Sequence, residues 1–170
     1  MLPRFSTRLF AIALALPATT TAMAIEGPAF RLVERDGAFE LREYAPHVVA
    51  DTRVESSFTD TGNAAFQRLF RYISGNNVAQ QKIAMTAPVT QAAAGDGYRV
   101  AFTLPASYTL ETAPTPLDKT IEIRAVPAQL VASWRYSGRW TESNYREHEA
   151  ALRAAIAARN LRVTGEPVLA

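Results

Sequence analysis

The 170-residue chain contains no cysteine, and this absence removes several kinds of chemistry at once. Without a thiol there is no disulfide, no thiolate nucleophile, no cysteine-ligated zinc and no covalently attached c-type haem. Histidine is almost as scarce, because His47 and His148 are the only two. A metal site built from closely spaced histidines is therefore excluded, and the fold must be held by packing, hydrogen bonds and ion pairs.

The sequence also lacks the motifs of the common enzyme classes. It contains no Gly-x-Ser-x-Gly, no His-Glu-x-x-His, no P-loop and no glycine-rich dinucleotide fingerprint. Its carboxylates are scattered along charged strand faces, as is usual for a solvated surface. An enzyme acting on haem or on a lipid-like ester would need a nucleophile–base pair, so these absences favour a protein that is not an enzyme.

No apolar stretch is long enough to span a bilayer. The N-terminus instead has the three parts of an export signal, which are the basic residues Arg4 and Arg8, a short apolar segment at 9–16, and small residues up to Ala24. We therefore predict that residues 1–24 are a signal peptide cleaved after Ala24; the alternative is a retained interfacial anchor. The mature protein would be periplasmic or secreted, without a stable membrane anchor.

Neither sign of charge is in excess in the rest of the chain. Of the 18 lysines and arginines, Arg4 and Arg8 lie in the predicted signal peptide, which leaves as many cations as the 16 aspartates and glutamates. Phosphate backbones bind to net basic surfaces, so we expect no nucleic-acid partner. Residues 25–170 suffice for a single domain with its own core, and they do not indicate an oligomeric state.

The residue patterns predict an α+β fold. Asp36-Gly37 is typical of a tight hairpin turn, and Phe66, Leu69 and Ile73 lie on one face of a helix. Helices are predicted from 59 to about 74 and, after an N-cap at Thr141, at 142–159. Strands are predicted at 30–35, 38–44, 47–55, 82–91, 98–104, 120–126 and 129–136, with another beginning at 161–163.

The two halves of the chain resemble each other at a shift of 82 residues, as Phe-Glu-Leu-Arg at 39–42 and Ile-Glu-Ile-Arg at 121–124 illustrate. We interpret this as a duplicated β-hairpin, helix, hairpin unit, with pseudo-repeats at about 38–104 and 120–170. The alternative is chance similarity between two amphipathic hairpins. Two such units would form one mixed sheet or a distorted barrel with two helices packed outside.

The repeat also predicts an open sheet edge. The second unit has no counterpart of the strand at 98–104, since the chain stops at Ala170 before that position is reached. The last strand is therefore expected to be missing, as it would be in a C-terminally truncated protein. A sheet edge without its neighbour is prone to pair with another chain.

One segment is distinctive as a literal string, the Lys-Ile-Ala-Met-Thr-Ala-Pro-Val of residues 82–89. Its alternation predicts a strand with the odd-numbered residues on one face. Together with the helix end at 70–77 and the hairpin at 39–44, this segment resembles the SOUL/haem-binding protein family, over about Phe30 to Ala170. The resemblance implies non-covalent (b-type) binding of haem or another tetrapyrrole in an apolar groove, by a carrier or buffer.

Such a groove needs apolar, partly aromatic walls, and cations near its mouth for the propionates. By position, the resemblance places Phe66, Phe70 and Arg71 of the first helix in the groove. Otherwise the two phenylalanines are core residues that fix the helix to the sheet. Met85 is a candidate wall or weak ligand and Lys82 a candidate propionate partner; the alternatives are a core methionine and a solvated lysine.

Axial ligation of a haem iron is not strongly predicted. His47 and His148 are weak candidates, and a half-buried, hydrogen-bonded histidine is the alternative for His148. One branch of the family has been proposed to use a histidine directly before the tyrosine of the first hairpin. Glu43 occupies that position here, so this ligand is absent.

A second hypothesis belongs to another functional class. The duplicated unit is similar to effector-binding domains of bacterial regulators, which hold amphiphilic small molecules in a cleft between two such halves. On this analogy of fold, the chain would be an interaction module for another amphiphile or for an envelope partner. A ligand screen with a preference for a non-tetrapyrrole amphiphile would favour this hypothesis.

Overall fold

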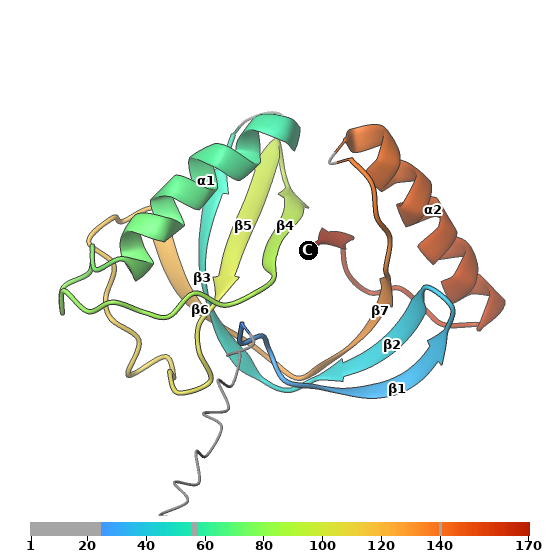
Figure 1. Ribbon diagram of the computed structural model, residues 1–170, viewed down its shortest axis with the longest axis horizontal. Coiled ribbons are helices and arrows are strands. Elements are labelled where there is room, and N and C mark those ends of the chain that lie inside the picture. Colours follow the sequence, from blue (N-terminus) through green and yellow to red (C-terminus); the bar gives the residue numbers. More distant parts are fainter. Residues whose placement is uncertain (1–24, 56–57, 140) are drawn as a thin grey trace, which may run out of the picture.

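The computed structural model describes residues 25–55, 58–139 and 141–170 and consists of two helices and two antiparallel sheets (Figure 1). The sheets have the orders β1-β2-β7 and β6-β3-β5-β4-β8. The elements are β1 (Phe30–Asp36), β2 (Phe39–Tyr44), β3 (His47–Val54), α1 (Phe58–Ile73), β4 (Val89–Ala94), β5 (Gly97–Thr103), β6 (Ile121–Val126), β7 (Gln129–Trp134), α2 (Glu142–Ala158) and β8 (Val168–Leu169). The predicted signal peptide lies outside the described residues. Neither helix is long and apolar enough to cross a membrane.

The predicted α+β class and both predicted helices are confirmed. α2 starts after Thr141, whose extended backbone and side chain form the expected N-cap, because its hydroxyl accepts a hydrogen bond from the amide of Asn144 at 3.3 Å. The first hairpin also forms as predicted. Gly37 in its turn has a φ of 57°, a conformation that costs glycine little.

The prediction of a mixed sheet or barrel is wrong, because every strand pair is antiparallel and the described strands do not close a barrel. The prediction that each unit opens with a hairpin is also wrong. β2 and β3 do not pair with each other but continue into different sheets, and so do β6 and β7. The links Ala45-Pro46 and Pro127-Ala128 lack the glycine or asparagine that a two-residue hairpin turn requires, so the chain bends instead of reversing.

The two ladders that join the halves of the chain share one register. Phe39 of β2 lies opposite Trp134 of β7, and Thr52 of β3 lies opposite Ile121 of β6. A shift of 82 residues carries Phe39 to Ile121 and Thr52 to Trp134, so each ladder maps onto the other. This is the pairing that a two-fold relation between the halves produces.

The distinctive segment at 82–89 is not a strand, except for Val89 at its end, where β4 begins. The predicted alternation fails as well, since Ile83 is 5% and Thr86 6% exposed whereas Met85 is 47% exposed. Pro88 has no amide hydrogen for a ladder. The preceding backbone makes single hydrogen bonds to separate parts of the molecule rather than to one neighbouring strand.

The strand predicted to begin at 161–163 does not form. The amide of Leu161 bonds to the carbonyl oxygen of Ile156 at 3.2 Å and so closes the end of α2. The preceding residue, Asn160, has a φ of 53°, as is common just after a helix. The chain then runs without regular structure to β8, which pairs with β4 at the edge of the five-stranded sheet.

The main core lies between α1 and the five-stranded sheet. From the helix, the buried residues are Ala65, Leu69, Tyr72 and Ile73. The sheet contributes Val48, Ala50, Val100, Phe102 and Ile121. The buried hydroxyl of Tyr72 donates a hydrogen bond to the carbonyl oxygen of Pro114 at 2.8 Å, and burial raises the pKa of Tyr72 to about 12.

α2 is attached differently, since none of its residues is buried. It lies beside β7 on the outer side of the three-stranded sheet (Figure 1). Arg159 at its end lies over the ring of Phe39 at 4.0 Å and forms ion pairs with Glu34 at 2.7 Å and Asp36 at 2.8 Å. The second helix is therefore held by half-buried side chains such as Leu152 and Ile156 together with these polar and ring contacts.

Candidate functional site

The aromatic face predicted on α1 is present. The rings of Phe66 and Phe70 stack with centroids 5.8 Å apart, as their spacing of one helical turn favours. Phe66 also contacts Phe102 of β5 edge-on at 5.5 Å and packs against the core, whereas Phe70 remains 40% exposed. Phe66 thus helps to pack α1 against the sheet, and Phe70 is the member of the pair that is exposed at the surface.

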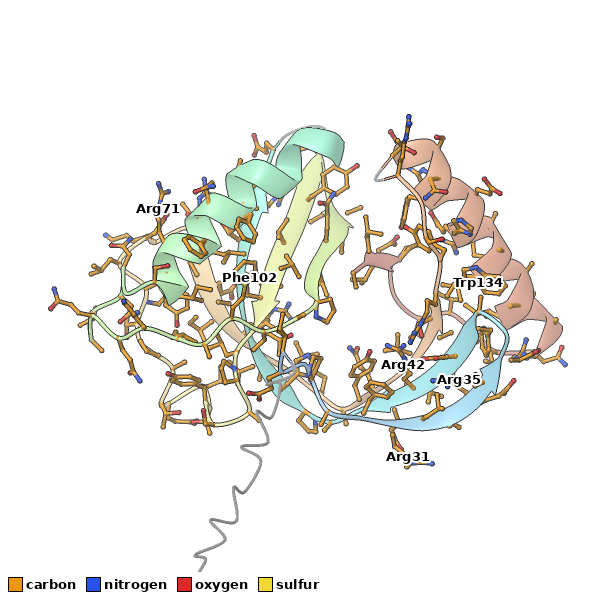
Figure 2. All side chains as sticks on the ribbon, viewed as in Figure 1. Arg31, Arg35, Arg42, Arg71, Phe102 and Trp134 are labelled. Atoms are coloured by element: carbon orange, nitrogen blue, oxygen red, sulfur yellow. The ribbon has the colours of Figure 1, made fainter. Side chains whose placement is uncertain are left out.

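The arginines of α1 differ in availability. Arg71 is exposed and extends from the side of α1 that faces away from the sheet (Figure 2). Arg68 is engaged, because its Nη1 donates to Thr52 Oγ1 at 2.8 Å and its Nε lies 3.8 Å from Asp118. Hydrogen bonds from Thr120 and, to a smaller extent, the positive charges of Arg68 and Arg71 lower the pKa of Asp118. Arg71 is therefore the helix cation that a ligand can reach more readily.

The distinctive segment runs beside the end of α1, because the amide of Ile83 donates to the carbonyl oxygen of Ile73 at 2.8 Å. A hydrogen bond from the hydroxyl of Thr86 to the carbonyl oxygen of Thr103 fixes it to β5. Lys82 and Met85 are both exposed. The structure thus brings their segment to the helix that carries Phe70, and it corrects the assignment of Met85 to a buried strand face.

Asn77 organises this region, although its sequence pattern shows no chemical role. It is fully buried, and its Nδ2 donates to the carbonyl oxygens of Tyr72 at 3.1 Å and Gln81 at 2.8 Å. Its Oδ1 accepts from the amide of Gln81 at 3.0 Å. One side chain therefore provides hydrogen-bond partners for three backbone groups of the turn between α1 and the distinctive segment.

The two histidines lie in different halves of the molecule. Nδ1 of His47, at the start of β3, is 2.9 Å from the carbonyl oxygen of Ala45. His148 on α2 stacks on Tyr136 with ring centroids 4.2 Å apart. Neither residue lies on α1, and the described residues contain no group of three or more acidic, histidine or cysteine side chains that could hold a metal ion.

Two hollows lie away from α1, between α2, β7 and the edge formed by β4 and β8. Their volumes are about 280 Å³ and about 160 Å³. The larger one is lined by aromatic and arginine side chains, including Trp134, Tyr136 and Arg135. The sequence patterns did not indicate these hollows, because they depend on contacts between segments far apart in the chain.

Comparison with known proteins identifies relatives. The family model described as SOUL heme-binding protein matches residues 25–169. Human Heme-binding protein 2 (Homo sapiens) is 39% identical over 74 residues, which are 41% of this chain and 36% of the human protein. The mouse protein of the same name (Mus musculus) is 38% identical over 72 residues, or 39% of this chain and 35% of the mouse protein. About a third of each relative is thus covered.

Proposed function

Since the chain belongs to the SOUL heme-binding protein family, we propose that it binds haem or a related tetrapyrrole without a covalent bond. Its role would be that of a carrier or buffer rather than of an enzyme. The match of the family model over residues 25–169 carries this proposal. The names of the two relatives, each covered over about a third of its length, agree with it.

We place the ligand on α1, where the residues have suitable chemistry. Phe70 offers an exposed ring backed by Phe66, and Arg71 offers a cation for a propionate. Lys82 and Met85 come from the segment bonded to the end of this helix. Because the face is open rather than enclosed, we expect weak binding through apolar contact and charge, without a strong axial ligand.

A haemin titration of the purified chain tests this proposal through Soret absorbance. We expect Phe66→Ala and Phe70→Ala each to weaken binding by about 1–3 kcal/mol, the value of burying one aromatic side chain. Leu130→Ala is the matched control, because Leu130 is 58% exposed on β7, away from α1. If haemin saturates a folded Phe66→Ala, Phe70→Ala double variant at the same concentration as the parent, the α1 site is wrong.

Two further proposals concern where the protein is located in the cell and how its fold arose. The N-terminal pattern supports export with cleavage after Ala24, and the mass of the protein recovered from the periplasm or medium would measure the cleavage site. An internal duplication is supported by the shared register of the β2–β7 and β3–β6 ladders. Recovery of the full-length mass from the membrane fraction alone would contradict cleavage after Ala24.

A further inference from the structure

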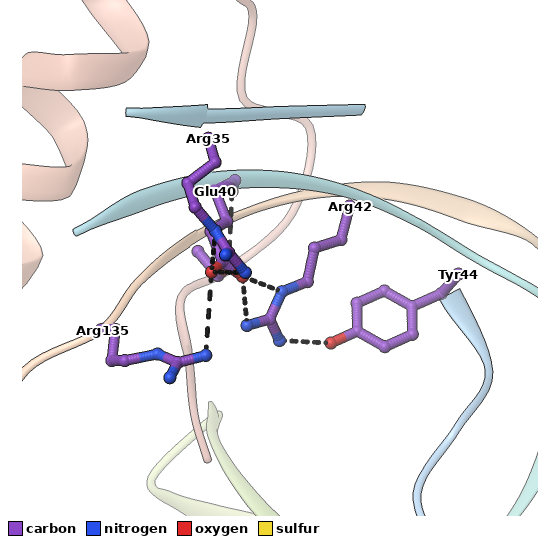
Figure 3. A network of polar contacts seen from close by, with 6 residues as sticks. Arg35, Glu40, Arg42, Tyr44 and Arg135 are labelled. Atoms are coloured by element: carbon purple, nitrogen blue, oxygen red, sulfur yellow. Dashed lines mark hydrogen bonds and ion pairs between the residues drawn. The ribbon is translucent and has the colours of Figure 1, made fainter. Parts of the chain in front are cut away.

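Three arginines share one buried carboxylate on the three-stranded sheet. The side chain of Glu40 is only 5% exposed. Arg42 Nε donates to its Oε2 at 2.7 Å, Arg35 Nε donates to its Oε1 at 2.9 Å, and Arg135 Nη2 lies 3.7 Å from the same Oε1 (Figure 3). Among the described residues these arginines form ion pairs with no other carboxylate, so the group carries three positive charges and one negative charge.

The three arginines are not equivalent. Arg42 is 20% exposed and also donates to the hydroxyl of Tyr44 at 3.0 Å, so it is committed to the protein. Arg35 and Arg135 are 58% and 73% exposed. Because both contact the same oxygen of Glu40, their guanidiniums lie side by side with most of each side chain open to a ligand.

A second group of ion pairs around a buried carboxylate, on the five-stranded sheet, has balanced charge. Asp51 of β3 is buried and pairs with Arg99 at 3.3 Å and Arg124 at 2.9 Å, and Glu122 lies 3.7 Å from Arg99. Two carboxylates thus face two arginines there. Arg124 is the residue that the 82-residue shift relates to Arg42. The positive excess is therefore specific to the Glu40 group and is not required by the sheet.

The larger hollow adjoins this excess charge. Its volume is about 280 Å³, its lining includes the aromatic residues Trp134, Tyr136 and Tyr145, and Arg135 and Arg139 contribute to it. Among the described residues no aspartate or glutamate side chain lines it, and Leu169 and Ala170 contribute the lining from the β8 side. A hollow of this size, near the lower end for small-molecule sites, suits a ligand of one or two rings.

We propose that Arg35 and Arg135, held by Glu40, bind the carboxylate of a planar aromatic molecule whose ring enters the hollow beside Trp134. Guanidiniums bind carboxylates through paired, charge-assisted hydrogen bonds. Aromatic side chains provide flat apolar contact for the ring. This site is separate from the α1 face, because it lies beside α2 and the three-stranded sheet rather than on α1 and the five-stranded sheet.

Two probes of the same shape test whether binding depends on the negative charge of the ligand. 2-Naphthoate carries a carboxylate, whereas 2-naphthamide is neutral. Titration of the full chain with each probe, followed by NMR shifts or calorimetry, should show saturable binding of naphthoate that is about tenfold tighter than that of the amide, or about 1.4 kcal/mol. Equal affinity for both probes, or no saturable naphthoate binding by the folded protein, overturns the proposal.

Single-residue variants test which arginines bind the carboxylate. Arg135→Gln and Arg35→Gln should each reduce naphthoate affinity toward that of the amide and leave amide affinity unchanged. Arg31→Gln is the matched control, since Arg31 lies on the same strand as Arg35 and is 69% exposed but pairs with Glu43 and points away from the cluster (Figure 2). Unchanged naphthoate affinity in Arg135→Gln, a substitution at a side chain that is 73% exposed, also overturns the proposal.

Haemin then distinguishes two sources of the carboxylate. If haemin displaces naphthoate and Arg135→Gln weakens haemin binding, the natural carboxylate is a tetrapyrrole propionate. If naphthoate remains bound in the presence of saturating haemin, it is that of a smaller aromatic acid. In either case Phe70→Ala should leave naphthoate affinity unchanged, so failure of the α1 site and failure of the arginine site give different results.

Discussion

The two halves of the molecule share their strand register but are stabilised by different interactions. In the first half, α1 buries Ala65, Leu69, Tyr72 and Ile73 against the five-stranded sheet. In the second half, α2 buries no residue and is attached through Arg159 and ring contacts. One helix is thus held by a fully buried apolar face, whereas the other is held by half-buried side chains and by polar contacts.

The difference in packing predicts unequal local stability. Regions with few buried apolar contacts open at a lower free-energy cost than the core. We therefore expect α2 to open before α1, although both helices have nearly the same length. A site formed beside α2 would be the more adaptable of the two proposed here.

The largest effect should follow from removing a core side chain of α1. Leu69 has no exposed surface, and Leu69→Ala should lower the free energy of unfolding by about 2–5 kcal/mol through lost burial and a cavity. The half-buried Leu152 of α2 is the matched control. Leu152→Ala should lower the free energy of unfolding by about 1 kcal/mol. Urea titration measures this free energy for both variants. Equal losses in the two variants would contradict the contrast between the helices.

The next largest effect concerns the Glu40 group on the three-stranded sheet. Glu40→Gln should cost about 1–3 kcal/mol of unfolding free energy, because hydrogen bonds to a charged group are lost. The control is the exposed Glu43, whose ion pair within the described part of the chain is with Arg31, and Glu43→Gln should cost at most about 1 kcal/mol. Thermal unfolding at neutral pH compares the two variants, and a larger loss in Glu43→Gln would disprove the assignment.

The same variant also makes a pH-dependent prediction. A hydrogen bond from Arg42, opposed by burial and assisted by the charges of Arg42 and Arg35, lowers the pKa of Glu40. A carboxyl whose pKa is lower in the folded state stabilises the fold above its unfolded pKa, and this contribution is lost as the pH falls through the folded pKa. Below about pH 4.5, the parent should therefore lose stability more steeply than Glu40→Gln.

The smallest effect should follow from loosening α2. Arg159→Gln removes the ion pairs to Glu34 and Asp36, so the amides of α2 should exchange with deuterium faster while those of α1 do not change. High salt should act in the same direction on the parent, because exposed ion pairs are screened. Arg153→Gln is the control, since Arg153 pairs with Glu149 inside α2. Identical protection of α2 in parent and Arg159→Gln would show that other contacts hold the helix.

Local patterns predicted the elements well because each depends on neighbouring residues. The stripe of Phe66, Leu69 and Ile73 gave α1, and its spacing placed Phe66 beside Phe70. The N-cap of α2 followed from Thr141 alone. By contrast, the pairing of β2 with β7 joins residues 85 to 95 positions apart, and no local pattern specifies such a partner.

The candidate sites divide in the same way. The α1 face could be predicted, since its residues lie within two helical turns. The exposed position of Met85 could not be predicted, because it depends on how the segment after α1 bonds to separate parts of the molecule. The partners of the Asn77 side chain lie within five positions of it, but the pattern of residue types did not show that this side chain would be buried. The Glu40 group needed the complete ladder, since Arg135 reaches Glu40 only when β7 lies beside β2.

The two proline-containing links have a mechanical consequence. Ala45-Pro46 and Pro127-Ala128 interrupt the long paired ribbon at the same level, where it passes from one sheet to the other. Sliding of one strand along the other would break both ladders at once, because they share a single register. Bending about the line through the two links breaks neither. A change in the angle between the two sheets would therefore disrupt the fewest strand hydrogen bonds if it took place about this line.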